Sequence, residues 1–181
     1  GTKRARLNAR GFEQVDGEHY NEDDKAAPVV TLSSIMVLLT LIVMLDWAAE
    51  LCDVNGAFLL DDFEAELNMF MFIPQGFEKY YPKDFVLKLI RPIYGCKQSA
   101  KRFWIKLLTV LNLMKFMRGA ADPCVYFRWT ADGLVLIASW VDDLLMCGKR
   151  ESVMSVKREL FSHLTCDDVG ELTEYVGCKI V

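Results

Sequence analysis

The spacing of hydrophobic and polar positions predicts several short strands interrupted by helices. Apolar residues follow helical spacing in Ser99–Lys115 and in Ser152–Leu164, and a third helix is expected from a cap at Thr31 or Ser33 to about Trp47. Strands are predicted at Arg4–Ala9, Ala49–Val54, Asn68–Ile73, Phe85–Ile90, Cys124–Trp129, Leu134–Trp140 and Leu144–Cys147, with a final strand pair in Glu171–Val181. Because helices are mixed with antiparallel strands, the predicted fold class is α+β.

Composition narrows the picture without deciding it. The apolar run Ile35–Leu45 is about half the length that spans a bilayer and ends at Asp46, so we expect a buried helix and no membrane partner. The net charge of −4 argues mildly against a nucleic-acid binder. The cations are nevertheless clustered, at Lys3–Arg10 and at Lys97–Lys106, as a protein that binds phosphate requires.

The metal-binding residue types suggest hard rather than soft ligands. The six cysteines form no CxxC pair and there are only two histidines, which gives no support for a zinc site. Scattered single cysteines, with no visible signal peptide, are typical of a reduced intracellular protein.

The most informative stretch is LVLIASWVDDLLMCG, in which Asp142 and Asp143 stand between two apolar strands. Adjacent carboxylates in such surroundings are costly unless they lie at a turn or face a cation. A tight hairpin would put both at its tip, within reach of a divalent metal such as magnesium. The alternative is an ordinary solvated turn, in which aspartate is also favoured.

A second acidic position strengthens the metal interpretation. Asp53 ends an apolar strand in ELCDVNGAFL, five residues before Phe58. Alone, Asp53 would more often be a strand-end cap than a ligand. Together with a hairpin Asp-Asp pair, it can complete the carboxylate set of a two-metal phosphoryl-transfer site.

Eight segments then point to a known family. In chain order they are ARLNARGFEQVDGEHYNE (5–22), APVV with the long helix after it (27–47), LDWAAELCDVNGAFL (45–59), PQGFE (74–78), IYGCKQSAKRFW (93–104), ADPCVYFR (121–128), WVDDLLMCG (140–148) and GELTEYVGCKI (170–180). In this order they resemble the reverse transcriptase of copia-type long-terminal-repeat retrotransposons, over essentially the whole chain.

The resemblance implies a right-hand polymerase with an antiparallel palm sheet backed by helices. Fingers are expected at about 1–47 and 62–100, and palm at about 48–61 and 101–181. Because the chain starts with Gly1 and ends in an apolar run, we expect a fragment of a longer Pol polyprotein, without the thumb, ribonuclease H and integrase parts.

The resemblance also assigns roles to residues. Asp53, Asp142 and Asp143 match the catalytic metal ligands, and Trp140 and Val141 the platform before the aspartate pair. The remaining matches concern nucleotide binding: Phe58 as a gate against the sugar 2′-hydroxyl, Tyr94 and Gly95 beside the incoming nucleotide, and Arg4, Arg6 and Arg10 for the triphosphate. The residues alone leave plainer roles open for this group: Phe58 as core, Gly95 as a turn and Arg4 as a solvated charge.

The implied activity is RNA-directed and DNA-directed DNA synthesis with two Mg²⁺ or Mn²⁺ ions. The expected partners are an RNA or DNA template with its primer, deoxynucleoside triphosphates and the rest of the polyprotein. The expected location is the cytoplasm, in virus-like particles.

Some positions depart from the family pattern. Trp140 replaces a tyrosine, and Asn55-Gly56 replaces Lys-Thr. Asp167-Asp168 stands where Met-Lys-Asp is common, which leaves Lys157 and Lys179 as candidates for a general-acid lysine. A decayed or repurposed copy that at most binds nucleic acid is therefore an alternative, whereas a nucleotide cyclase would need a glycine-glycine-acid hairpin that is absent.

Overall fold

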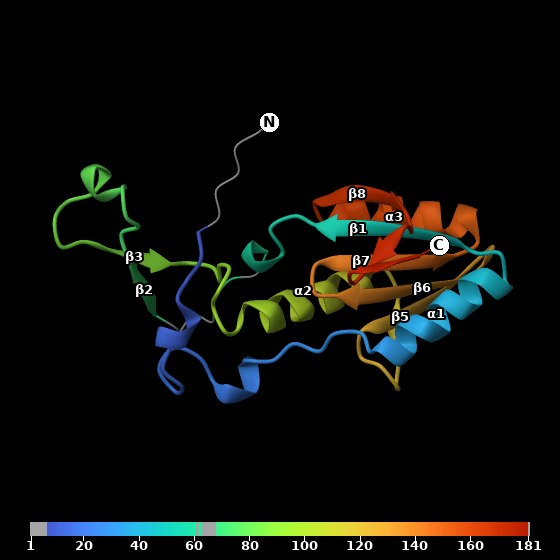
Figure 1. Cartoon of the computed structure of the whole chain (residues 1–181), viewed down its shortest axis with the longest axis horizontal. Coiled ribbons are helices and arrows are strands. Elements are labelled where there is room, and N and C mark those ends of the chain that lie inside the picture. Colours follow the sequence, from blue (N-terminus) through green and yellow to red (C-terminus); the bar gives the residue numbers. More distant parts are fainter. Residues whose placement is uncertain (1–6, 61, 63–67, 181) are drawn as a thin grey trace. The chain divides into compact units, whose positions relative to one another are not determined.

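The structure is a computed structural model that describes residues 7–60, 62 and 68–180 (Figure 1). Within this part of the chain the helices are α1 (Leu32–Met44), α2 (Ser99–Leu113) and α3 (Arg150–His163). The strands are β1 (Ala48–Val54), β2 (Met69–Phe72), β3 (Val86–Leu89), β4 (Met117–Arg118), β5 (Val125–Thr130), β6 (Gly133–Trp140), β7 (Asp143–Gly148), β8 (Cys166–Glu171), β9 (Glu174–Tyr175) and β10 (Cys178–Lys179). The mixture of helices with antiparallel strands confirms the predicted α+β class.

The chain folds into two compact units. One contains the described residues up to Ala27 together with those of Phe58–Phe103, and the other contains Pro28–Ala57 and the described residues from Trp104 onward. We call these the hairpin unit and the sheet unit. Whether they correspond to fingers and palm stays a prediction.

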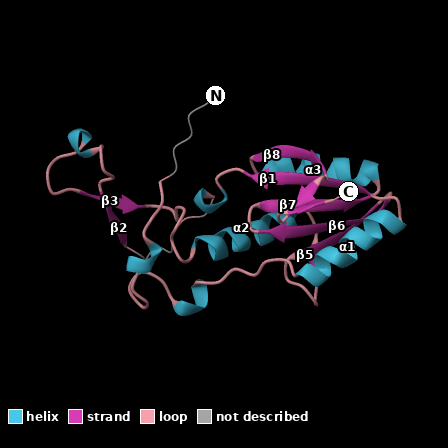
Figure 2. Cartoon of the chain, in the orientation of Figure 1, coloured by secondary structure: helices cyan, strands magenta, loops and turns pink. Residues whose placement is uncertain are grey.

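A six-stranded sheet organises the sheet unit, in the order β4-β5-β6-β7-β1-β8 with every neighbouring pair antiparallel (Figure 2). β5, β6 and β7 form consecutive hairpins, as the sequence predicts. β1 comes much earlier in the chain and inserts between β7 and β8. β1 is buried along most of its length, as expected of an interior strand, and its buried positions include Glu50.

Successive side chains of a strand point to opposite faces, and the two faces of this sheet meet different helices. Ala49 and Leu51 of β1 share a core with Ile35 of α1 and with Tyr175 of β9. Glu50, between them, points the other way and accepts a hydrogen bond from Lys157 of α3. The sheet therefore has an α1 face and an α3 face.

Asp122 fixes the start of α1 to the strand β5. Its carboxylate accepts hydrogen bonds from the Thr31 N–H at 2.9 Å, the Ser34 hydroxyl at 2.6 Å and the Cys124 N–H at 2.9 Å. Burial acts to raise the pKa of Asp122, but these hydrogen bonds outweigh it and hold the pKa below its usual value. The segment ADPCVYFR thus has a structural role in this fold.

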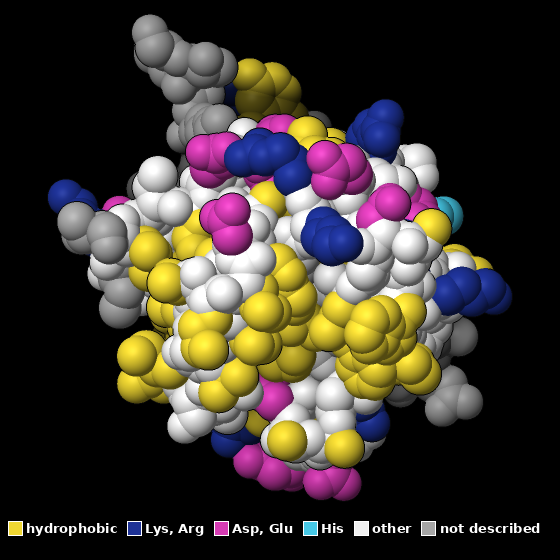
Figure 3. Space-filling model, turned by 90° about the vertical axis from the view of Figure 1, so that its right-hand side faces the viewer, with side chains coloured by type: hydrophobic (Ala, Val, Ile, Leu, Met, Phe, Trp, Pro, Cys, Tyr) yellow, Lys and Arg dark blue, Asp and Glu magenta, His cyan; other side chains and the backbone are white. Residues whose placement is uncertain are grey.

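The α1 helix confirms one prediction and corrects another. Thr31 caps it, accepting a hydrogen bond from the Ser34 N–H, but the helix ends at Met44, three residues before the predicted Trp47. The expected burial is wrong for its outer side, because only Ile35 and Leu38 are buried. Met36, Val37, Val43 and Met44 are exposed, and Figure 3 shows hydrophobic side chains gathered on the surface seen in that view. No helix in the described ranges combines the length and the apolar character needed to cross a membrane.

Hydrogen bonds between distant segments hold the hairpin unit together. The Gln14 side chain accepts from the Lys97 backbone N–H at 2.7 Å and donates to the side-chain oxygen Oε1 of Gln98 at 2.9 Å. The Lys97 ammonium donates to the Tyr20 hydroxyl at 2.8 Å. These contacts join the segment that begins near residue 8 to the segment IYGCKQSA. β2 and β3 form a separate two-stranded sheet in this unit.

Two further predictions need correction. In the predicted strand Arg4–Ala9, residues 4–6 lie outside the described part, and Asn8 makes only an isolated bridge with Tyr94. The edge strands β4 and β8 were not predicted at all. β8 has the sequence CDDVGE, whose acids and glycine disfavour strands, and it forms by pairing with β1.

Candidate active site

The sheet brings Asp53 next to the Asp142-Asp143 pair. Asp53 of β1 lies directly opposite Asp143 of β7, and the Val54 N–H donates to the Asp142 carbonyl oxygen at 3.0 Å. Directly opposite residues of antiparallel strands have Cβ atoms roughly 5 Å apart and point to the same face. Asp53 and Asp143 therefore lie side by side on the α1 face, as the sequence predicts.

Asp142 lies in the tight turn between β6 and β7. Trp140 pairs with Asp143, so the turn consists of Val141 and Asp142. Val141 has a φ of 53°, a left-handed conformation that is strained for a β-branched residue. This strained residue lies at the hairpin tip, directly before Asp142.

Negative charges in this cluster repel one another at Asp143. The pKa of Asp143 is raised, first by burial and then by the negative charges of Asp142 and Asp53. Within the described part of the chain, no three Asp, Glu, His or Cys side chains are already arranged to hold a metal ion. The backbone thus brings the acids together, while the side chains do not form a ready-made metal cluster.

The raised pKa of Asp143 predicts a stability effect. A carboxyl group whose folded pKa exceeds its unfolded value binds its proton better in the folded state, so it destabilises the fold once pH rises through the folded pKa. Asp143→Asn should therefore raise the free energy of unfolding at pH 7, by about 0.5–1 kcal/mol after allowance for solvent screening. Thermal melts in EDTA measure it.

The control for this variant is Asp132→Asn, which changes an exposed aspartate in the other two-residue hairpin turn, between β5 and β6. The gain from Asp143→Asn should shrink as pH falls toward 4, because the wild-type carboxyl group then becomes protonated. An equal gain at pH 4 and pH 7 would contradict the electrostatic explanation.

The structure adds one acidic residue to this row. Asp167 of β8 lies directly opposite Asp53, on the side away from Asp143, and its carboxylate accepts a hydrogen bond from the Asn55 amide at 2.8 Å. The α1 face thus carries the aspartates 143, 53 and 167 in one line across three strands. The sequence offered one signal, the departure at Asp167-Asp168, but without β8 nothing connected it to Asp53.

A cavity of about 550 Å³ adjoins Asp143 on this face. Trp140, Leu51 and Val169 line it from the sheet, and the segment from Glu174 to Gly177 lines it from the β9–β10 hairpin. The predicted platform residue Trp140 therefore borders the same space as Asp143. This space is large enough for a nucleotide-sized group beside the carboxylates.

The structure removes Lys157 as a general-acid candidate. Its ammonium donates to Glu50 at 2.7 Å and to Asp168 at 2.5 Å, and the Lys157 and Glu50 side chains are almost fully buried. Glu50 and Asp53 are three positions apart on β1, so they point to opposite faces of the sheet. Lys157 therefore joins α3 to β1 and β8, away from the aspartate row.

The predicted nucleotide-binding residues that are described belong to the hairpin unit. The rings of Phe58 and Tyr94 meet edge to face, with centroids 4.8 Å apart. Gly95 has a φ of 89°, and a Cβ atom there would lie 2.1 Å from the Ala9 carbonyl oxygen. This close approach is itself a reason for glycine, and contact with a nucleotide stays a prediction for Phe58, Tyr94 and Gly95.

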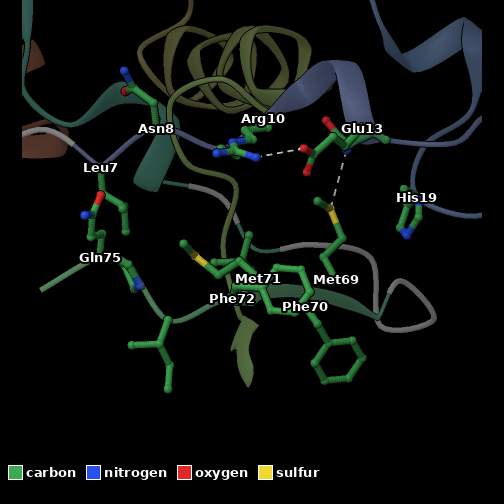
Figure 4. Close-up of a pocket in the computed structure, with 15 residues that line it drawn as sticks. Leu7, Asn8, Arg10, Glu13, His19, Met69, Phe70, Met71, Phe72 and Gln75 are labelled. Atoms are coloured by element: carbon green, nitrogen blue, oxygen red, sulfur yellow. Dashed lines mark hydrogen bonds and ion pairs between the residues drawn. The ribbon is translucent and has the colours of Figure 1, made fainter. Parts of the chain in front are cut away.

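Arg10 lies at a cleft of about 420 Å³ in the hairpin unit (Figure 4). Its guanidinium pairs with Glu13 at 3.1 Å, and both side chains are largely exposed. Arg4 and Arg6 lie outside the described residues. A surface pair of this kind contributes little stability, so Arg10 can exchange Glu13 for another anion.

Comparison with known proteins identifies the family of the chain. The family described as reverse transcriptase (RNA-dependent DNA polymerase) matches residues 1–181. The chain is 34% identical over 180 residues to the retrovirus-related Pol polyprotein from transposon TNT 1-94 of Nicotiana tabacum, covering 98% of this chain and 13% of that protein. It is 31% identical over 145 residues to the Pol polyprotein from transposon RE2 of Arabidopsis thaliana, covering 80% of this chain and 10% of that protein.

The match to the transposon RE1 polyprotein of Arabidopsis thaliana is 27% over 177 residues, covering 97% of this chain and 12% of that protein. No solved structure gives a match. The chain thus corresponds to a small part of the length of these relatives. The chain belongs to the reverse transcriptase (RNA-dependent DNA polymerase) family, as a copia-type retrotransposon reverse transcriptase domain.

Proposed function

We propose that the chain is the catalytic part of an RNA-directed DNA polymerase that copies retrotransposon RNA into DNA, with Asp53, Asp142 and Asp143 as its catalytic carboxylates. The observation that carries this proposal is the pairing of β1 with β7. It sets Asp53 opposite Asp143 and bonds Val54 to the backbone of Asp142. Residues that are distant in the chain thus meet at one end of neighbouring strands.

The chemistry of the three side chains fits divalent cations. Carboxylate oxygens are the ligands that Mg²⁺ and Mn²⁺ prefer. The raised pKa of Asp143 reflects burial and mutual repulsion, and the repulsion is what bound cations would relieve. We therefore propose that these aspartates hold two Mg²⁺ or Mn²⁺ ions. When bound, such ions supply the positive charge that activates the primer 3′-hydroxyl and stabilises the leaving pyrophosphate.

The chain's own residues would mainly position the substrates. In this proposal the primer terminus occupies the cavity beside Asp143, with the Trp140 ring as a wall for stacking. Phe58, supported edge-on by Tyr94, crowds the sugar 2′ position. Arg10 leaves Glu13 to bind the triphosphate, since charge-assisted bonds to phosphate are stronger than an exposed ion pair.

Primer extension tests the proposal. The protein is incubated with an RNA template, a labelled DNA primer and deoxynucleoside triphosphates, with Mg²⁺ or Mn²⁺ or with EDTA. Because the chain is a small part of its relatives, a longer chain that includes the flanking polyprotein is tested in parallel. Extension that needs the cation supports the proposal. No extension by either chain, while a known reverse transcriptase extends the same primer, contradicts it.

A decayed copy that only binds nucleic acid is the second candidate. The observation that favours it is Asp167, an additional negative charge opposite Asp53, in the Asp167-Asp168 pair that stands where Met-Lys-Asp is common in the family. Tight template binding without extension under any cation would select this candidate.

A further inference from the structure

The outer side of α1 is a continuous surface of mainly apolar side chains. Because an α-helix has about 3.6 residues per turn, the exposed positions of α1 fall on one side, opposite Ile35 and Leu38, which pack on the sheet. The apolar residues on this side are between 57% and 82% exposed, namely Leu32, Met36, Val37, Val43 and Met44. Ser33 and Thr40 lie among them, and we call these residues together the outer α1 surface.

The composition of this surface indicates an apolar protein partner. α1 contains no charged residue, so it offers no cation to a phosphate and none of the Lys or Arg residues by which an interfacial helix binds a membrane. The Thr40 hydroxyl already donates to the Met36 carbonyl oxygen at 2.8 Å, so covering it leaves no donor unsatisfied. Since a helix that is apolar on all sides is normally buried on all sides, a second protein surface is needed to complete the burial of α1.

A second copy of the chain is a partner whose contact area fits this surface. The outer α1 surface exposes on the order of 500 Å² in each copy, so two copies packed through it would bury about 1,000 Å² in total, the lower limit of a specific interface. Such a contact is self-complementary, because in a twofold dimer the same patch of each copy faces the other. An interface of this size predicts a weak, reversible dimer.

The ends of α1 favour an antiparallel arrangement of the two helices. The first turn of α1 contains no acid to balance the partial positive charge of the helix N-terminus. Asp46, two residues beyond the end of the helix, is exposed. In an antiparallel pair centred on Thr40, Asp46 of one copy and Leu32 of the other lie about 9 and 12 Å from the centre in the same direction. The carboxylate therefore comes close to the helix end that attracts anions.

From these observations we propose that the outer α1 surface joins two copies of this chain, with their α1 helices antiparallel about a twofold axis at Thr40. The axis lies there because Thr40 is midway between Met36 and Met44 on the exposed side. The small side chain of Thr40 lets the two helix axes approach to about 8–10 Å, the separation of packed helices. This contact does not depend on the proposed function.

Sedimentation velocity of the whole chain at about 1 to 100 μM measures the association, since a small interface gives a micromolar dissociation constant. Val37→Glu should raise the dissociation constant by about 100-fold, because each copy would bury a charge in an apolar contact. Asp46→Asn should raise it about two- to five-fold, the effect of losing one charge at a helix end. Met154→Glu is the matched control and should associate as the wild type does, because Met154 is also an exposed apolar helix residue of the sheet unit but lies on α3.

Disulfide cross-linking tests the antiparallel arrangement, and it also decides the question if Val37→Glu does not fold. Thr40→Cys should form a covalent dimer on mild oxidation, because the two copies of this side chain meet at the axis. Ser33→Cys is the matched control on the same side of α1. Its two copies would lie about 21 Å apart along the axis, so it should cross-link no more than the oxidised wild-type chain does.

Three results would overturn the proposal. The first is a wild-type chain that stays monomeric at every concentration, with no cross-linking of Thr40→Cys. In that case, protection of Thr40→Cys from a maleimide only in a longer chain would assign the surface to a flanking segment, and binding to phosphatidylcholine vesicles would assign it to a membrane. The second is a dimer that Val37→Glu, folded with the wild-type melting temperature, leaves unchanged. The third is equal cross-linking of Ser33→Cys and Thr40→Cys, which would contradict the antiparallel contact.

Discussion

Replacing Asp142 by asparagine is expected to lower the rate of primer extension by at least about 1,000-fold. The rate is measured in the shortest form of the protein that extends a primer, either this chain or a longer one that includes flanking polyprotein. The reason is that catalysis here would depend on carboxylate charge at the hairpin tip, and removal of a central electrostatic group costs roughly two to three orders of magnitude or more. Asparagine has the same size and can occupy the same turn, so the loss should come without unfolding. Single-nucleotide incorporation measures the rate.

The matched control is Asp132→Asn. Asp132 also follows the first residue of a two-residue hairpin turn, between Thr130 and Gly133, and belongs to no row of acids across neighbouring strands. It should retain the wild-type rate. Comparable losses in both variants would show that the turn, rather than the charge at Asp142, limits the reaction. Retained extension in Asp142→Asn would exclude the assigned role of Asp142.

The sequence was sufficient to predict the three strands that assemble the acidic cluster, but it placed both Asp142 and Asp143 in the turn, whereas Asp143 is the first residue of β7. The runs ending at Asp53 and flanking Asp142-Asp143 are strongly apolar, and each folded as the expected strand. The pattern could not show that β1 inserts between β7 and β8, because pairing of distant strands is a tertiary property. The resemblance to a family supplied that link, and the register of β1 with β7 now gives it a physical basis.

The parts that could not be predicted depend on tertiary context. β8 contains Asp167, Asp168 and Gly170, which have low strand propensity, and pairing with β1 overrides that preference. As a result the fourth acid, Asp167, was not connected with the site. The outer side of α1 could not be judged either, since an apolar helix is expected to be covered on all sides.

Lys157 illustrates the same limit. From the sequence it was one of two lysines available for proton transfer. The structure places it on the α3 face in hydrogen bonds with Glu50 and Asp168, where it stabilises the packing of α3 on the sheet. The alternation of β1 could have shown that Glu50 and Asp53 face opposite ways, but only the fold shows that Lys157 reaches Glu50.

Gly95 gives the second prediction with a large expected effect. Two backbone segments cross at this point, since the Ala9 N–H donates to the Tyr94 carbonyl oxygen at 2.7 Å. A Cβ atom on Gly95 would lie 2.1 Å from the Ala9 carbonyl oxygen, and one on Gly11 would lie 2.1 Å from the Gly95 carbonyl oxygen. Both clashes are with backbone atoms, which cannot move aside as a flexible side chain can.

Gly95→Ala should therefore destabilise the hairpin unit by about 3 kcal/mol, adding the strain of a left-handed alanine to that of overpacking. Two variants separate these contributions. Gly76→Ala tests the backbone strain alone, because Gly76 has a φ of 90° with nothing within 4 Å of its Cβ position, and it should cost about 1 kcal/mol. Gly11→Ala tests the crowding at the same crossing.

Amide hydrogen exchange of peptides from the hairpin unit measures the local free energy of opening in each variant. The expected order of destabilisation is Gly95→Ala above Gly11→Ala and Gly76→Ala. If Gly95→Ala instead matched Gly76→Ala, the two segments would not be closely packed in solution. A third outcome is that Gly95→Ala keeps the wild-type stability but binds nucleotide more weakly. That outcome would favour the role implied by the family resemblance, with Gly95 approaching the incoming nucleotide.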